Sequence, residues 1–241
     1  MAGMRRSRTL VLALALCAAG ACAGTERDPD LPRRSNAPNG HPWIEIPESD
    51  WETLFDGVSL DGWKETGDAA WAVADGTLCG ATGGGQHSFL VTARSFGDFV
   101  LELEVLAERS GNSGIQIRSR LDGGVMRGYQ IEVDPSPRAW SGGLYEEGGR
   151  GWLQDLSDNP AARAAFRPDG WNRYRIECRG PRIRSWVNGV AAADYAEAAV
   201  REGVIGLQVH GGADVRVLWR NIRIRRLGPE QPDFVLPDPG D

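Results

Sequence analysis

The chain has 241 residues, of which 25% are charged and 41% are hydrophobic. One globular domain of ordinary size accounts for this length, and the composition argues against extensive disorder. The formal net charge of −6 argues against a partner bound through phosphate contacts, so no nucleic-acid partner is expected. The chain has 32 glycines and nine tryptophans, a composition that suits short strands and tight turns better than helices.

The N-terminus has the pattern of a bacterial export signal. Three arginines precede an apolar run over residues 10–21, which is too short to span a bilayer comfortably. The run ends in Ala19-Gly20-Ala21-Cys22, which is similar to a lipoprotein cleavage box. We therefore expect residues 1–21 to be a lipoprotein-type signal peptide and Cys22 to carry the lipid.

The remaining chain divides into three parts by composition. Residues 22–45 are polar and Pro-rich and are expected to form a tether, residues 46–228 a β-sandwich domain, and residues 229–241 an extended tail. The alternative for the N-terminus is an ordinary secreted protein cut near Ala21 or Ala23. In both cases export is expected. The favoured location is the cell envelope, in the periplasm or at the outer membrane, with membrane contact only through the lipid anchor.

Two cysteines remain in the domain, Cys79 and Cys178. An oxidising compartment permits a disulfide between them. Both also lie in strand-like patterns, where a cysteine is often a small buried residue. The sequence leaves these alternatives open, and it contains no CxxC pair and no zinc spacing.

Apolar and polar residues alternate from residue 71 onward, a pattern that predicts β-strands. Asn188-Gly189 predicts a type I′ hairpin turn, and Asn159 followed by Pro160 gives the best helix signal. Together the strands predict an all-β domain of two antiparallel sheets packed face to face. The clearest strands are residues 99–105, 113–119, 129–134, 174–178, 183–187, 204–210 and 215–227.

Three predicted strands carry polar residues at alternate positions. If these strands are neighbours, the polar side chains share one face and lie ~5 Å apart. A carboxylate, an imidazole, a guanidinium and several amides suit the hydroxyl groups of a sugar, and the acid–base pair can move protons. The alternative is a solvated outer face with incidental charges. The residues are Gln116 and Arg118; Gln130, Glu132 and Asp134; and Gln208 and His210, with Glu102 and Glu104 as further candidates.

A long irregular segment from residue 142 to residue 170 supplies further candidates, because loops of this length are often functional. Trp152 could stack on a sugar ring or plug the loop, and Arg150 could anchor a hydroxyl or a carboxylate. Tyr145 and Glu147 lie in the same segment. Asn112, in a Gly-rich stretch, either binds substrate or forms a plain turn.

An ordered set of motifs between Trp51 and Leu227 resembles the 3-keto-disaccharide hydrolase family, also known as domain of unknown function 1080. Each motif is weak alone, but their order is fairly specific. They are Leu54-Phe55-Asp56-Gly57, Leu60-Asp61-Gly62-Trp63, Trp71-Ala72-Val73, Asp75-Gly76-Thr77-Leu78, Asp98-Phe99, Gly111-Asn112-Ser113-Gly114-Ile115, Gly128-Tyr129-Gln130-Ile131-Glu132, Gly206-Leu207-Gln208-Val209-His210-Gly211 and Arg220-Asn221-Ile222-Arg223-Ile224.

The resemblance implies a concanavalin A-like jelly-roll sandwich that acts on glycosides already oxidised to a ketone at C3. A C3 ketone acidifies the C2 proton, so that a base, an enolate stabiliser and an acid suffice to eliminate the C1 substituent. Glu132 and His210 are expected to be base and acid, in an order left open, and Arg118 to stabilise the enolate. Substrate hydroxyls would be oriented by Gln116, Gln130 and Gln208, with Asp134, Tyr145, Glu147, Arg150, Trp152 and Asn112 as further binding residues.

The chain departs from the family at one point. Many relatives read Tyr-Glu-x-Gln where this chain reads Tyr129-Gln130-Ile131-Glu132, which moves the carboxylate by two residues along the same face and puts its role as base in question. No cofactor is certain, and a divalent cation is left open. Glu132, Asp134 and His210 would be its candidate ligands, although no spacing demands one.

Two rival functions remain. A retaining endoglucanase needs two carboxylates ~5 Å apart, and its Glu-x-Asp-x-x-Glu signature fails here because Glu132-Val133-Asp134-Pro135-Ser136 is followed by Pro137. The second rival is a non-catalytic, lectin-like envelope lipoprotein that captures glycans, because fold does not determine function.

Overall fold

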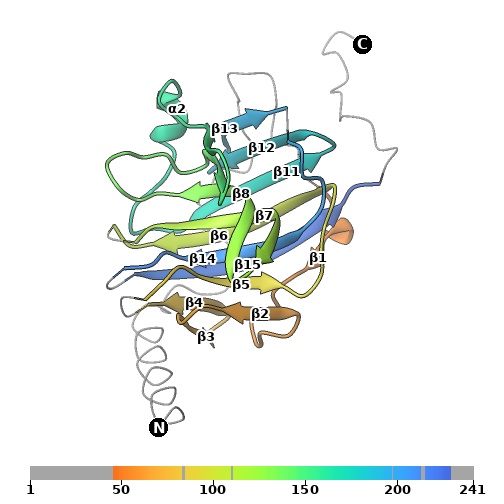
Figure 1. Ribbon diagram of the computed structural model, residues 1–241, viewed down its shortest axis with the longest axis vertical. Coiled ribbons are helices and arrows are strands. Elements are labelled where there is room, and N and C mark those ends of the chain that lie inside the picture. Colours follow the sequence, from red (N-terminus) through yellow and green to blue (C-terminus); the bar gives the residue numbers. More distant parts are fainter. Residues whose placement is uncertain (1–45, 83–84, 110, 197, 213–214, 229–241) are drawn as a thin grey trace.

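The computed structural model (Figure 1) describes residues 46–82, 85–109, 111–196, 198–212 and 215–228. The predicted signal peptide at 1–21, the lipidation site Cys22, the tether at 22–45 and the tail at 229–241 lie outside these residues. Within the described ranges, no helix is both long enough and apolar enough to cross a membrane.

The described residues form two antiparallel sheets stacked face to face (Figure 1), as predicted. Sheet A has the order β13-β12-β11-β6-β15-β4-β3, and β1 pairs with β15. Its strands are β1 (Glu52–Thr53), β3 (Ala70–Ala74), β4 (Thr77–Ala81), β6 (Phe99–Ala107), β11 (Asn172–Arg179), β12 (Arg182–Val187), β13 (Val190–Tyr195) and β15 (Arg216–Arg226).

Sheet B has the order β10-β9-β8-β7-β14-β5-β2. The predicted polar strands are therefore neighbours, because β8, β7 and β14 lie side by side in this sheet. Its strands are β2 (Trp63–Thr66), β5 (Ser88–Thr92), β7 (Ser113–Asp122), β8 (Val125–Val133), β9 (Leu144–Glu147), β10 (Gly151–Gln154) and β14 (Val204–Val209). The described helices are the 3-10 helix η1 (Glu48–Asp50) and the short helix α2 (Pro160–Arg163).

The core lies between the sheets and is built from alternate strand positions. Leu101 and Leu103 of β6, Ile115 of β7 and Ile131 of β8 are all at most 1% exposed. Burying a side chain of this size contributes roughly 1.5–3 kcal/mol. The same alternation turns the intervening residues of β7, β8 and β14 to the outer face of sheet B, where the site lies.

A predicted turn and a predicted helix start are both confirmed. Asn188 and Gly189 have φ angles of 49° and 83°, as a type I′ turn requires. Asn159 caps α2 by accepting a hydrogen bond from the Ala162 amide at 3.1 Å, with Pro160 in the first turn.

The bridge between Cys79 and Cys178 that the sequence left open is not formed, because Cys178 carries a free thiol. Cys178 belongs to the core between the sheets, whereas Cys79 packs with Trp171 and Leu218 in a separate cluster. Complete burial raises the pKa of the Cys178 thiol to about 12, so this cysteine is an inert packing residue.

Glu102 and Glu104 do not join the polar row of β7, β8 and β14, because they belong to sheet A. Glu102 accepts hydrogen bonds from Arg173 at 2.8 Å and from Arg223 at 2.7 Å, and Glu104 accepts one from Arg220 at 2.7 Å. Arg220 also lies 4.2 Å from the Trp171 ring centroid. These two carboxylates are therefore structural residues in a buried ion-pair network.

Candidate functional site

A polar pocket of about 300 Å³ lies on the outer face of sheet B. Its volume is at the lower end of the range for small-molecule sites. Eight of the twelve predicted catalytic and binding residues line it, together with two residues that the sequence did not single out. The lining residues are Asn112, Gln130, Glu132, Tyr145, Glu147, Trp152, Gln208 and His210, with His87 and Arg138 in addition.

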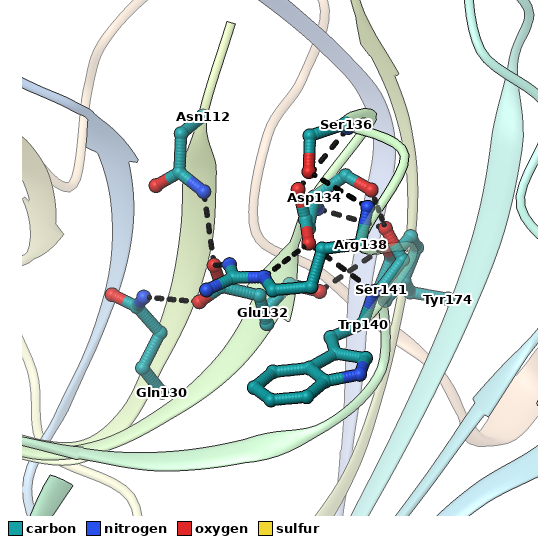
Figure 2. Close-up of polar contacts among 9 residues, drawn as sticks. All are labelled: Asn112, Gln130, Glu132, Asp134, Ser136, Arg138, Trp140, Ser141 and Tyr174. Atoms are coloured by element: carbon teal, nitrogen blue, oxygen red, sulfur yellow. Dashed lines mark hydrogen bonds and ion pairs between the residues drawn. The ribbon is translucent and has the colours of Figure 1, made fainter. Parts of the chain in front are cut away.

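Glu132, at the end of β8, is the buried carboxylate of this pocket. Figure 2 shows three donors converging on it: Asn112 Nδ2 and Arg138 Nη2 donate to Oε1 at 2.9 and 3.1 Å, and Gln130 Nε2 donates to Oε2 at 2.9 Å. Burial raises the pKa of Glu132, although these three donors oppose the rise. The donors favour the carboxylate form, and the burial makes that carboxylate a stronger base than an exposed one.

A chain of hydrogen bonds behind Glu132 fixes the amide that contacts it. Ser119 Oγ donates to Gln116 Oε1 at 2.8 Å, and Gln116 Nε2 donates to Gln130 Oε1 at 2.6 Å. Gln116 and Gln130 lie opposite each other in the β7–β8 ladder, and both are at most 3% exposed. The predicted binding residue Gln116 therefore acts from beneath the pocket floor, by orienting Gln130.

Arg138 supplies the guanidinium group of this site, a role that the sequence analysis assigned to Arg118. Its Nε donates to Asp134 Oδ2 at 2.7 Å (Figure 2), and its guanidinium lies 4.9 and 5.2 Å from the ring centroids of Trp140 and Trp152. Asp134 was predicted to bind substrate. Its carboxylate instead holds Arg138 against Glu132 and accepts hydrogen bonds from the Ser136 and Trp140 amides.

The predicted enolate stabiliser Arg118 lies away from the pocket. A register shift between Ile117 and Arg120, with a φ of 47° at Arg118, breaks the alternation of β7. The side chain is fully buried, donates to the carbonyl oxygens of Gly97 and Gly180, and pairs with Asp98 at 2.7 Å. Arg118 is thus a structural residue. Arg150, another predicted binding residue, also lies outside the pocket lining, and it pairs with Glu146 at 2.5 Å.

His210 and the unpredicted His87 also line the pocket, with ring centroids 4.3 Å apart in an edge-to-face contact. His210 Nδ1 contacts the Gly211 carbonyl oxygen at 2.7 Å, and the Gly211 amide donates to His87 Nδ1 at 3.2 Å. Partial burial and the neighbouring His210 lower the pKa of His87, which favours a neutral ring. His87 precedes β5, and only the pairing of β5 with β14 brings it beside His210.

Glu147 of β9 brings a second carboxylate into the pocket. Burial and the charge of Glu132 raise its pKa, while His210 opposes the rise. A carboxyl group in this setting retains its proton to higher pH than an exposed glutamate does. The pocket therefore combines two carboxyl groups with raised pKa values, of which Glu132 is held by three donors, and an imidazole.

Gln208 of β14 carries an orphaned acceptor. The side chain is 1% exposed, and its Oε1 has no hydrogen-bond partner among the described residues. An unsatisfied buried acceptor is unfavourable by roughly 1–3 kcal/mol. A ligand that donates a hydroxyl proton to this oxygen would remove that penalty.

Two aromatic rings, those of Tyr145 and Trp152, also line the pocket. Trp152 contacts both Trp140 and Tyr145 edge to face, with centroid distances of 4.8 and 5.3 Å. Trp152 therefore borders the pocket, as the sugar-stacking prediction requires, and it also packs against its aromatic neighbours Trp140 and Tyr145.

The described residues gather no set of three or more His, Cys, Asp and Glu side chains that could hold a metal ion. Of the three candidate ligands, Asp134 has both oxygens engaged by Arg138, Ser136 and Trp140. Glu132, Asp134 and His210 therefore do not make up such a set of three among the described residues.

The fold recurs in solved structures. A candidate glycosyl hydrolase from Parabacteroides distasonis superposes with a TM-score of 0.56 at 19% identity, covering 76% of this chain and 99% of that chain. A carbohydrate-binding module from Bacillus subtilis superposes with a TM-score of 0.53 at 17% identity, covering 68% of this chain and 95% of that chain. The β-glucanase of Bacillus licheniformis superposes with a TM-score of 0.52 at 12% identity, covering 73% of this chain and 97% of that chain. At such identities the likeness establishes the fold, a jelly-roll sandwich as predicted.

Comparison of sequences is more specific. Among curated proteins, none matches this chain. The family model for the 3-keto-alpha-glucoside-1,2-lyase-like domain matches residues 50–225, which is nearly all of the described sandwich and the span of the motifs found in the sequence. The chain therefore belongs to the 3-keto-alpha-glucoside-1,2-lyase-like family, and this membership supports a carbohydrate-active or carbohydrate-binding role.

Proposed function

We propose that this protein cleaves 3-keto-glycosides by removing the C2 proton and eliminating the C1 substituent. The observation that carries the proposal is the buried Glu132 carboxylate, held by three donors inside a small polar pocket. Family membership supports the choice of substrate class.

Glu132 is the proposed base. It takes the C2 proton, the C2–H electron pair forms a C2=C3 double bond, and the carbonyl pair moves onto O3 as an enolate. Asn112, Gln130 and Arg138 keep the carboxylate oriented while its charge is consumed. Arg138 also places positive charge beside the developing anion.

Glu147 and His210 are the proposed pair on the leaving-group side. As the enolate re-forms the C3 ketone, a C1=C2 double bond forms and the C1–O1 bond breaks. The departing O1 takes a proton from Glu147, whose raised pKa suits a proton donor. His210 lies close enough to influence that pKa and can receive protons during the reset. Water adding to the product afterwards would complete a net hydrolysis.

The polar environment suits a sugar ring. Gln208 Oε1 needs a donor, and a sugar hydroxyl supplies one. Trp152 and Tyr145 offer apolar surface beside the polar groups, which is the usual composition of a sugar site.

The decisive experiment is a turnover assay with the purified protein on a panel of 3-keto-glucosides and their unoxidised parents. We expect aglycone release from the keto sugars alone, at a rate at least about 100-fold above that of Glu132→Gln. Identifying the sugar product as an unsaturated ketone or as a hydrated 3-keto sugar separates lyase from hydrolase. Parallel assays with EDTA test the divalent cation: a loss of turnover that an added divalent cation restores would show that the reaction needs one.

A lectin-like function is the alternative outcome. If no keto sugar is cleaved while the protein retains a glycan, and Glu132→Gln leaves that affinity within a few-fold, the pocket is a binding site and the catalytic proposal is wrong.

We also propose export and lipid anchoring at Cys22, on the strength of the N-terminal sequence pattern. Expression of the full chain in a bacterium should place it in the membrane fraction of the cell envelope. Cys22→Ala should release it into the soluble envelope fraction. An unchanged distribution of the variant would contradict the anchor.

A further inference from the structure

We propose that His87 is a further catalytic residue, whose Nε2–H donates to the C3 ketone oxygen of the substrate, and that Gly211 is the positioning residue that fixes this donor. The inference rests on the proposed function, because it assigns the one role in the elimination that no residue above fills by direct contact, the hydrogen bond to the enolate oxygen.

The backbone of Gly211 determines which nitrogen of each ring carries the proton. A backbone amide can only donate, so His87 Nδ1, which receives the Gly211 N–H at 3.2 Å, must be unprotonated. A backbone carbonyl can only accept, so His210 Nδ1, at 2.7 Å from the Gly211 oxygen, must be protonated. One peptide residue therefore sets opposite Nδ1 states in the two rings, without a proton on His87 and with a proton on His210.

The two rings consequently present opposite functions to the pocket. Both His87 and His210 line it, and their centroids are 4.3 Å apart. His87 offers a proton at Nε2, and His210, whenever its ring is neutral, offers a lone pair at Nε2. Neither Nε2 has a hydrogen-bond partner among the described residues, so both are available to a ligand.

This arrangement suits a ketone at C3. A ketone oxygen only accepts hydrogen bonds, so it pairs with His87 Nε2–H. The bond strengthens as the C2–H electron pair moves toward C3 and charge builds on O3. The proton stays on His87, and the electron pair returns to the carbonyl when C1–O1 breaks. A neutral imidazole N–H is a known electrophile for such carbonyls.

Gly211 occupies its position because no side chain fits there. A Cβ on Gly211 would lie 2.8 Å from the Gly85 carbonyl oxygen and 3.1 Å from the His87 amide nitrogen. These are backbone atoms, which cannot rotate away. An alanine would push the segment that carries His87 away from β14 and lengthen the amide bond to His87 Nδ1.

The first test measures turnover of 3-keto-glucosides by His87→Phe, His87→Gln and Gly211→Ala. We expect His87→Phe to lower kcat by about 100-fold, the effect of losing one oxyanion donor. His87→Gln retains an N–H at the Nε2 position and should recover at least about tenfold of that loss. Gly211→Ala should lower kcat with both rings present. Gln86→Ala, at the exposed neighbour of His87, is the matched control and should keep wild-type kcat.

The second test reads the tautomers directly by NMR of the ¹⁵N-histidine-labelled protein, with signals assigned from single-histidine substitutions. We expect Nδ1 to be unprotonated on His87 and protonated on His210. In Gly211→Ala we expect this difference between the two rings to be lost. The proposal is overturned if both rings share one tautomer, or if His87→Phe keeps kcat within threefold of wild type. A wild-type protein that cleaves no keto sugar would instead refute the proposed function, and the tautomer result would still stand for the site.

Discussion

The amide of Gln130 occupies the space that a side chain at Gly114 would need. Gly114 lies opposite Glu132 in the β7–β8 ladder, and a Cβ built on it collides with the Gln130 side chain. Gly114 therefore leaves the opening through which Gln130 reaches Glu132 Oε2 at 2.9 Å. A glycine inside a strand often marks such a close approach.

Gly114→Ala should displace Gln130 and break its hydrogen bond to Glu132. A hydrogen bond to a charged group contributes about 1.5–3 kcal/mol, so kcat/KM on a 3-keto-glucoside should fall roughly tenfold to 100-fold. Gly97→Ala is the control, because its Cβ would meet only the Arg201 carbonyl oxygen at an ordinary 3.6 Å. Equal activity in the two variants would show that the Gln130 contact is unimportant.

The pH dependence of the activity should follow the ionisation of Glu132. The base must be ionised, and burial raises its pKa, so activity should fall as the pH drops through a value above that of an ordinary glutamate. A profile of kcat/KM against pH measures this fall at low pH, which is the acid limb of the profile. Glu132→Gln should lower kcat by at least about 100-fold and abolish the limb. Glu146→Gln, which removes the partner of Arg150 outside the pocket lining, should leave the limb in place.

Arg138 and Arg118 should respond to substitution in opposite ways. Arg138→Met removes a cation that lowers the pKa of Glu132, so the acid limb should move to higher pH and kcat/KM should fall. Arg118→Met leaves the carbonyl oxygens of Gly97 and Gly180 without their donor. It should lower the free energy of unfolding by at least about 2 kcal/mol and leave the acid limb unchanged. Urea denaturation of both variants measures the free energy of unfolding, and their pH–rate profiles measure the acid limb. A shifted acid limb in Arg118→Met would restore the predicted catalytic role of Arg118.

Gln208→Met should separate stability from function. The substitution conserves volume and removes the orphaned acceptor Oε1, so the free energy of unfolding should stay level or rise by about 1 kcal/mol. Substrate affinity should fall about tenfold, because a sugar hydroxyl loses its acceptor. Thermal unfolding and KM measure the two effects. A variant that is destabilised and binds normally would mean that Gln208 serves the fold alone.

The network on sheet A should be a stability element. Burial alone would raise the pKa of Glu102, but Arg173, Arg175 and Arg223 lower it below the ordinary value. The folded state thus binds the proton less tightly than the unfolded chain, so the stabilisation is present above the ordinary glutamate pKa and is lost as the pH falls through the lowered one.

Glu102→Gln should lower the free energy of unfolding by about 3–5 kcal/mol at neutral pH, because it leaves buried arginines without their carboxylate. The Glu102→Gln substitution should also make the free energy of unfolding depend less on pH in the acid range. The turnover of 3-keto-glucosides should not change. Glu65→Gln, at an exposed position of β2, is the control for charge removal. Urea denaturation at several pH values checks both effects.

The sequence alone determined the sandwich and most of the pocket. Alternation placed Leu101 and Ile115 in the core and Gln130 on the outer face, because a strand turns successive side chains to opposite sides. The positive φ that Asn188-Gly189 tolerates determined a hairpin. Ordered motifs identified the family, and the alternation of polar positions placed Glu132, Gln208 and His210 on one face if their strands are neighbours.

Only the tertiary structure decided which charged groups meet in the site. A bulge in β7 turns Arg118 away, and no pattern of period two can anticipate an inserted residue. Arg138 and His87 lie outside the strands and reach the pocket only through the turn after β8 and through the pairing of β5 with β14. Contacts between residues far apart in the chain depend on strand order and register, which packing of the whole sandwich selects.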